Sequence, residues 1–237
     1  PWAGMVKFAR TGGEANAIAV RIARAASKNK NIAFCGYHGW HDWYLASNLE
    51  NPGNLNTHLL KKIPTGGVPE NLKNTIFGFN YNDFDKLEYL IKNKKIGILI
   101  MEVVRNISPK DNFLKKIQKI TKKNNIKLIF DECTSGFRND FGGIHKSFGV
   151  EPDLAMFGKS LGNGYAITAC LGKKNIMKYA NECFISSTFW TERIGYVAAL
   201  KTLEVMKKNK SWKIVKEKGK KIIQIWKDIS KRNKIDL

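Results

Sequence analysis

Cysteine is scarce, with four residues in a chain of 237, and each cysteine stands alone without a C-x-x-C pair. This spacing indicates neither a zinc site nor a disulfide framework. His38 and His41 lie in a turn with no third ligand nearby, so we expect no metal. No apolar run approaches the roughly 18 residues that a membrane-spanning helix needs, and no secretory pattern is visible near the first residue. These absences predict a cytoplasmic protein with no membrane partner.

Acidic residues are also few, since 20 Asp and Glu stand against 41 Lys and Arg, a net charge of +21. This excess alone favours nucleic acid or an anionic surface as a partner. However, the lysines come in pairs on predicted helix faces, such as Lys115-Lys116 and Lys220-Lys221, and no zinc finger or RNA-recognition signature accompanies them. We therefore expect no nucleic-acid partner, and a basic nucleic-acid-binding module remains only as an alternative.

Strand-like and helix-like segments alternate along the chain. A composition of 43% hydrophobic and 11% aromatic residues excludes disorder and allows a sizeable core. Alternating strands and helices predict a right-handed, parallel α/β sheet. The expected strands are residues 32–35, 96–104, 127–132 and 154–157, and the expected helices are residues 14–28, 82–93, 112–124, 192–208 and 212–231. Residues 37–70 are expected to form a functional loop.

The residues that follow three of these strands carry the chemistry, because ligands of open α/β sheets bind beyond the carboxyl ends of the strands. These residues are Tyr37-His38-Gly39, Asp131-Glu132-Cys133 and Gly158-Lys159-Ser160. The last of them suggests a P-loop. That motif also needs a glycine five residues before Gly158, where this chain has Asp153, so we reject a P-loop.

Lys159 can instead act as a nucleophilic amine that condenses with an aldehyde, provided that local desolvation lowers its pKa. Asp131 could then hold a protonated pyridine nitrogen, the arrangement that makes pyridoxal phosphate (PLP) an electron sink. Thr11-Gly12-Gly13, just before a predicted helix, offers unpaired N–H groups that suit a phosphate. The plainer alternatives are a surface charge at Lys159, a helix cap at Asp131 and a simple capped turn at Thr11.

These motifs, taken together, resemble the class III aminotransferases of PLP fold type I, and most of all the branch similar to glutamate-1-semialdehyde aminomutase. The resemblance covers nearly the whole chain in order. It is carried by Thr11-Gly12-Gly13-Glu14-Ala15-Asn16, Tyr37-His38-Gly39, Asp131-Glu132-Cys133-Thr134-Ser135-Gly136-Phe137-Arg138, Gly149-Val150-Glu151-Pro152-Asp153-Leu154 and Gly158-Lys159.

The resemblance implies a three-layer α/β/α fold with a mostly parallel central sheet, and a role for each matching residue. Lys159 would form the Schiff base with PLP, Asp131 would pair with the pyridine nitrogen, and Tyr37 would stack on the ring. Further cofactor-binding residues would be Thr11, Gly12 and Gly13 at the phosphate, Cys133 on the other face of the ring, His38, Glu102 and Asn106 near the ring, and Thr188 at the phosphate of the partner subunit in a homodimer.

The implied activity is transfer of an amino group from a small-molecule donor to a carbonyl acceptor. Glutamate-1-semialdehyde 2,1-aminomutation is an alternative, and so is a PLP fold without catalysis. Gly13 stands where Ser or Thr is usual, and Cys133 replaces a usual Val. We expect residues 1–208 to be a PLP-binding large domain truncated at its N-terminus, and residues 209–237 to be a helix that leads into a small domain absent from this fragment.

Overall fold

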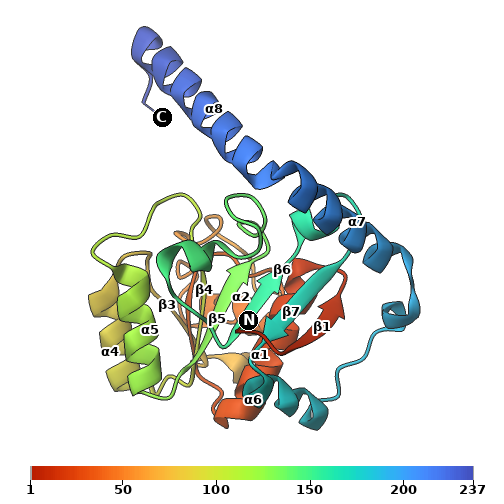
Figure 1. The fold of residues 1–237 in the computed structure, drawn as a ribbon. Helices are drawn as coiled ribbons and strands as arrows, with labels where there is room; N and C mark the ends of the chain where they lie inside the picture. Colours follow the sequence, from red (N-terminus) through yellow and green to blue (C-terminus); the bar gives the residue numbers. More distant parts are fainter. Residues whose placement is uncertain (1, 237) are drawn as a thin grey trace.

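The computed structural model describes residues 2–236 and contains one seven-stranded sheet flanked by helices (Figure 1). The strands are β1 (Met5–Ala9), β2 (Ile32–Cys35), β3 (Ile76–Gly78), β4 (Ile98–Glu102), β5 (Lys127–Glu132), β6 (Leu154–Phe157) and β7 (Thr168–Gly172). The α-helices are α1 (Gly12–Ser27), α2 (Asp42–Leu45), α3 (Ser47–Glu50), α4 (Phe84–Lys94), α5 (Phe113–Lys123), α6 (Lys174–Met177), α7 (Ile194–Asn209) and α8 (Ser211–Asn233). Short 3₁₀ turns are η1 (Glu70–Leu72), η2 (Ile144–Phe148), η3 (Lys159–Leu161), η4 (Lys178–Glu182) and η5 (Thr188–Thr191).

The sheet has the strand order β1-β7-β6-β5-β4-β2-β3 and is mostly parallel. β7 pairs antiparallel with both of its neighbours, β6 and β1, whereas the pairs from β6 through β3 are all parallel. The carboxyl ends of β2, β4, β5 and β6 therefore meet at one edge of the sheet. The expectation of a mostly parallel α/β sheet is confirmed.

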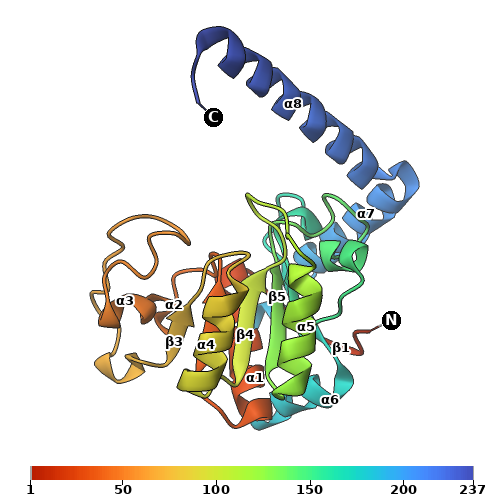
Figure 2. The same cartoon turned by 90° about the vertical axis from the view of Figure 1, so that its left-hand side faces the viewer.

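Two hydrophobic clusters, one on each face of the sheet, make up the core. In β2, Ile32 and Phe34 belong to the cluster that includes residues of α1, while Ala33 and Cys35 belong to the cluster that includes residues of α4 and α5. This alternation is the two-residue period of a strand buried on both faces. Figure 2 shows α4 and α5 together on one face of the sheet, so the three-layer expectation is also confirmed.

Helix α1 lies against the centre of the sheet and begins at a defined cap. The side chain of Thr11 accepts a hydrogen bond from Glu14 N, and the side chain of Glu14 accepts one from Thr11 N, which together form a capping box. Ala15, Ala19 and Val20 lie on its buried face. The capping box therefore positions the first turn of α1 directly beside the carboxyl edge of the sheet.

Most predicted elements appear within a few residues of their expected bounds. The strands expected at residues 32–35, 127–132 and 154–157 are β2, β5 and β6, and the longer one expected at 96–104 is limited to β4. β1, β3 and β7 were not predicted, because they are short and carry weaker apolar patterns. The loop expected at residues 37–70 contains two single-turn helices, α2 and α3.

Helix α7 packs against the body of the protein through Ala199 and Tyr196, and α8 extends away from it (Figures 1 and 2). At the start of α8, the ring of Trp212 packs against the ring of Phe141 in the body, with centroids 5.2 Å apart. No residue of α8 is buried, and its large apolar side chains, among them Trp226, are exposed. Within residues 2–236, no helix combines the length and the apolar character needed to cross a bilayer.

Candidate active site

A cavity of about 270 Å³ opens where the carboxyl ends of β2, β5 and β6 meet the first turn of α1. Several widely separated segments of the sequence contribute to its wall. The lining residues are Thr11, Gly12, Gly13, Asn16, Tyr37, Gly39, Trp40, Asp131, Cys133, Thr134, Gly158, Lys159 and Thr168. Most of the residues predicted to bind a cofactor are thus brought together in one place.

Lys159 directly follows Gly158 at the end of β6, and its side chain reaches across to the next strand end. Its Nζ donates a hydrogen bond to Oγ1 of Thr134 at 2.6 Å. The backbone of Lys159 has φ = 40°, a left-handed conformation that is unfavourable for a residue with a side chain and is often found at functional sites. Lys159 is exposed and lines the cavity.

Asp131 is buried at the floor of the cavity, where three donors hold its carboxylate. Oδ2 accepts hydrogen bonds from Nδ2 of Asn16 at 2.7 Å and from Nδ1 of His38 at 2.9 Å, and Oδ1 accepts one from the backbone N–H of Cys133 at 3.0 Å. Burial raises the pKa of Asp131, but these hydrogen bonds and the charge of His38 outweigh it, and the net pKa is lowered. The cavity therefore has a fixed negative charge at its floor.

His38 supports Asp131 from beneath the cavity wall instead of lining the cavity. Its ring is fully buried, and Nε2 lies 3.2 Å from the backbone oxygen of Cys35. The neighbouring Tyr37 is half-buried and does line the cavity. The turn that follows β2 thus provides both an aromatic residue that lines the cavity, Tyr37, and a hydrogen-bond donor to the buried carboxylate, His38.

The N-terminus of α1 provides two free donors at one corner of the cavity. The capping box uses the N–H groups of Thr11 and Glu14, whereas the N–H groups of Gly12 and Gly13 have no hydrogen-bond acceptor among residues 2–236. Free N–H groups and the helix dipole favour an anion at this position. Thr168 closes the corner from β7 by donating from Oγ1 to the backbone oxygen of Thr11 at 3.1 Å.

Cys133 lines the cavity between Gly12 and Gly158. Its Sγ lies 3.4 Å from the position of a Cβ built on Gly12 and 3.6 Å from that of a Cβ built on Gly158. Burial and the charge of Asp131 raise the pKa of Cys133 well above the usual thiol range. Cys133 therefore contributes a neutral, polarizable thiol to the wall.

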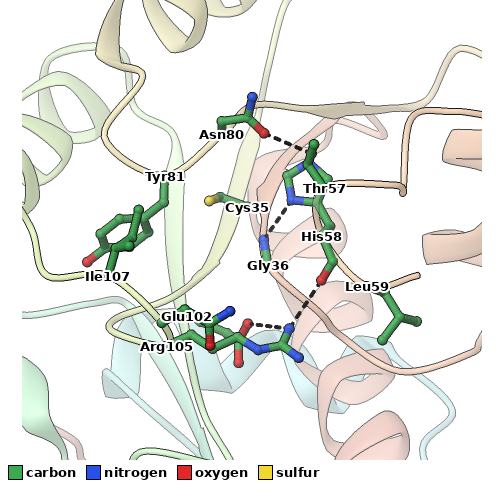
Figure 3. Close-up of a pocket in the computed structure, with 11 residues that line it drawn as sticks. Cys35, Gly36, Thr57, His58, Leu59, Asn80, Tyr81, Glu102, Arg105 and Ile107 are labelled. Atoms are coloured by element: carbon green, nitrogen blue, oxygen red, sulfur yellow. Dashed lines mark hydrogen bonds and ion pairs between the residues drawn. The ribbon is translucent and has the colours of Figure 1, made fainter. Parts of the chain in front are cut away.

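Glu102 and Asn106 line a second cavity, of about 320 Å³, which is drawn in Figure 3. Oε2 of Glu102 accepts a hydrogen bond from the backbone N–H of Tyr37 at 3.1 Å and lies 3.4 Å from Nη1 of Arg105. Burial raises the pKa of Glu102, opposed by the hydrogen bond from Tyr37. The structure therefore places these two predicted cofactor residues in a separate cavity, outside the one that Lys159 lines.

Thr188 lies outside both cavities. It begins η5 and is exposed, and this turn packs near β1, where Nε1 of Trp190 donates to the backbone oxygen of Phe8 at 2.8 Å. In this single chain Thr188 does not meet the other predicted cofactor residues.

Asn16, Thr134 and Thr168 contribute to the site although they were given no role from the sequence. Asn16 and Thr134 lie inside the motifs used for the resemblance, so their positions were available as a signal. Thr168 lies on β7, which was not predicted. Each of the three holds another site residue in place by a hydrogen bond.

We expect Asn16→Ala to lower the free energy of unfolding at neutral pH by about 1 to 3 kcal/mol, because it removes a buried hydrogen bond to a charged group. A depressed folded-state pKa stabilises the protein above the usual range of Asp, and this contribution is lost as pH falls through the folded pKa. Without Asn16 the folded-state pKa of Asp131 rises towards its value in the unfolded chain, so less stability is lost between neutral and acidic pH. Urea unfolding as a function of pH measures both effects. Asn80→Ala, which removes an exposed amide, is the control, and equal stability of the two variants would contradict the assignment.

The sheet order, the three layers and the position of the site at the carboxyl edge are those of fold type I PLP-dependent transferases. Within this class, the chain belongs to the aminotransferase class-III family, whose sequence profile matches residues 3–236.

Relatives and solved structures agree with this family. The chain is 37% identical over 230 residues to 3-aminobutyryl-CoA aminotransferase of Cloacimonas acidaminovorans, covering 93% of this chain and 51% of that protein. It is 40% identical over 216 residues to glutamate-1-semialdehyde 2,1-aminomutase of Nitrosopumilus maritimus, covering 87% and 50%. The crystal structure of an omega-transaminase from Sphaerobacter thermophilus matches with a TM-score of 0.74 and 27% identity over 87% of this chain and 50% of that chain. The chain spans about half the length of these relatives.

Proposed function

We propose that the protein is an aminotransferase that binds PLP in the cavity between Lys159 and Asp131 and moves an amino group from a donor to a carbonyl acceptor. The observation that carries this proposal is the meeting of an amine, a buried carboxylate and two free backbone N–H groups around one cavity. Family membership and the aminotransferase relatives support it.

The residues of the cavity fit this cofactor. Gly12 and Gly13 offer N–H groups to the phosphate, and the charged Asp131 suits a protonated pyridine nitrogen. Tyr37 and Cys133 provide aromatic and thiol surface for the ring. PLP, when bound, supplies an aldehyde that condenses with amines and a ring that accepts the electron pair left on the substrate carbon.

The chain's own residues would then perform binding, orientation and proton transfer. Lys159 Nζ carries the proton that leaves the substrate carbon, as a general base whose position is set by Thr134. Asp131 keeps the ring nitrogen protonated, and Asn16 and His38 hold that carboxylate in its charged form. The reaction thus combines a base on one side of the cavity with a fixed charge at its floor.

The proposal is tested by adding an amine to the protein, expressed with its native flanking sequence and loaded with PLP. The visible absorption of the bound cofactor is expected to fall as the amino group is taken up, and to return when a carbonyl acceptor is added. A panel of α-amino acids and ω-amines should include at least one such donor. A bound cofactor whose spectrum no member of the panel changes would contradict the proposal.

A second candidate is aminomutation, in which the amino group returns to the same carbon skeleton. The relative named glutamate-1-semialdehyde 2,1-aminomutase supports it. The two candidates differ in their products, because intermolecular transfer releases one carbonyl product for each donor consumed and aminomutation releases none. Incubation with glutamate-1-semialdehyde and quantification of free carbonyl products separates them.

We also propose a homodimer in which Thr188 reaches the phosphate in the partner subunit, supported by its exposure and its absence from the lining of the cavity in its own chain. Thr188→Ala is then expected to weaken PLP binding about tenfold, by loss of one hydrogen bond to a charged group. Thr191→Ala, in the same turn, is the matched control. Light scattering gives the oligomeric state, and a monomer that binds PLP with full affinity would overturn this part of the proposal.

Two further parts of the proposal concern organisation and location. Residues 1–208 would form the PLP-binding unit, and α8, which has no buried residue, would pack within a further domain. All four cysteines are free, and three of them are buried, which supports a reducing compartment such as the cytoplasm.

A further inference from the structure

The anion-binding corner of the cavity is backed by His41, which plays no part in the function proposed above. The imidazole lies against Gly13, where a Cβ would come within 2.7 Å of Cε1 and 2.9 Å of Nδ1 of His41. Such distances are too short for a real side chain. The absence of a side chain at Gly13 therefore creates the space that the imidazole occupies.

Nδ1 of His41 is buried and has no hydrogen-bond partner among the residues that the structure describes. His41 is the N-cap residue of α2, yet its side chain makes no capping hydrogen bond there. A buried polar atom without a partner is unfavourable, and such atoms in folded proteins call for an explanation. The free nitrogen indicates a partner that arrives with a ligand.

The ring of His41 is held in a defined place beside the cavity. Trp40, which lines the cavity, stacks on it with centroids 4.8 Å apart and planes 21° apart. Gly39 has φ = 101°, and a Cβ there would lie 3.0 Å from Cα of Gly13 and 3.8 Å from Nδ1 of His41. The two glycines thus bring the turn against the first turn of α1, so that Nδ1 lies next to Gly13, which lines the cavity.

We propose that Nδ1 of His41 donates a hydrogen bond to the phosphate of the cofactor, as a third donor beside the N–H groups of Gly12 and Gly13. This inference rests on the proposed function. An imidazole N–H that meets a phosphate oxygen makes a charge-assisted hydrogen bond, which is stronger than one between neutral groups. Because the bond needs the phosphate, His41 makes the site selective for the phosphorylated form of the cofactor.

The test is an equilibrium titration of cofactor-free protein with PLP and, separately, with pyridoxal, which lacks the phosphate. His41→Ala is expected to weaken PLP binding about tenfold or more, while pyridoxal binding changes less than about twofold. His41→Asn places an amide nitrogen close to the position of Nδ1 and should retain most of the affinity. His41→Gln reaches towards the position of Nε2 and should behave like His41→Ala.

The outcomes separate this inference from the proposed function. If the wild-type protein binds no PLP, the proposed function fails, and this inference fails with it. If the wild type binds PLP and His41→Ala binds it equally well, or loses PLP and pyridoxal affinity by the same factor, only the role of His41 is overturned. Thermal unfolding without cofactor shows whether each variant is folded. If His41→Ala is not folded, the comparison is made between His41→Asn and His41→Gln, and equal PLP affinity of these two variants overturns the inference.

Discussion

Lys159→Ala is expected to lower the rate of amino transfer by at least about 10³-fold, because it removes both the amine that would carry the cofactor and the base that moves the proton. The visible absorption that depends on the covalent link should disappear, although noncovalent binding remains through Asp131 and the glycines of α1. Absorption spectra and single-turnover rates with an amino donor measure the two effects.

Lys173→Ala is the matched control for this variant. Lys173 is also a lysine close to the sheet, but its Nζ pairs with Asp153 at 2.8 Å, and it does not line the cavity. Its removal should leave both the spectrum and the rate unchanged. A Lys159→Ala protein with the wild-type spectrum would remove Lys159 from its proposed role.

Asp131→Asn should retain the cofactor and lower the rate of amino transfer by about 10²- to 10³-fold, as expected for the loss of one preorganised charge. The substitution preserves shape but removes the charge that keeps the ring nitrogen protonated. The lowered pKa of Asp131 means that the wild-type carboxylate is charged throughout the neutral range, so the loss should persist there at every pH. Steady-state rates measured from acidic to basic pH test this.

Asp153→Asn controls for the general effect of removing a hydrogen-bonded aspartate beside a strand. Asp153 accepts a hydrogen bond from Leu128 N at 2.9 Å, outside the cavity. Asp153→Asn should lower the free energy of unfolding but leave the rate of amino transfer by the folded protein unchanged. Full activity in Asp131→Asn would mean that the buried carboxylate does not act on the cofactor.

The sequence predicted most of the fold because its central strands are continuous apolar runs. β2, β5 and β6 are buried on both faces, and their ends coincide with glycines or with charged residues. β7 was not predicted, because its five residues include a threonine and end in glycine. Its antiparallel direction follows from pairing with β6 and β1, which a local pattern does not reveal.

The sequence also predicted that Lys159, Asp131 and Tyr37 would share a site, because the ends of parallel strands meet at one edge. The position of Glu102 and Asn106 depends on how the loop after β4 turns, and this loop places them in the second cavity. The hydrogen bonds of Asn16 and the position of His41 depend on how α1 packs against the turn after β2. Such contacts arise only from tertiary packing, so spacing in the sequence does not predict them.

The most direct test of the account is to identify the lysine that carries the cofactor. The protein, expressed with its native flanking sequence and loaded with PLP, is reduced with borohydride, digested and mapped by mass spectrometry. The account predicts the pyridoxyl group on the peptide that contains Lys159, and its absence from that peptide in Lys159→Ala. Labelling of a different lysine, with Lys159 unmodified, would contradict it.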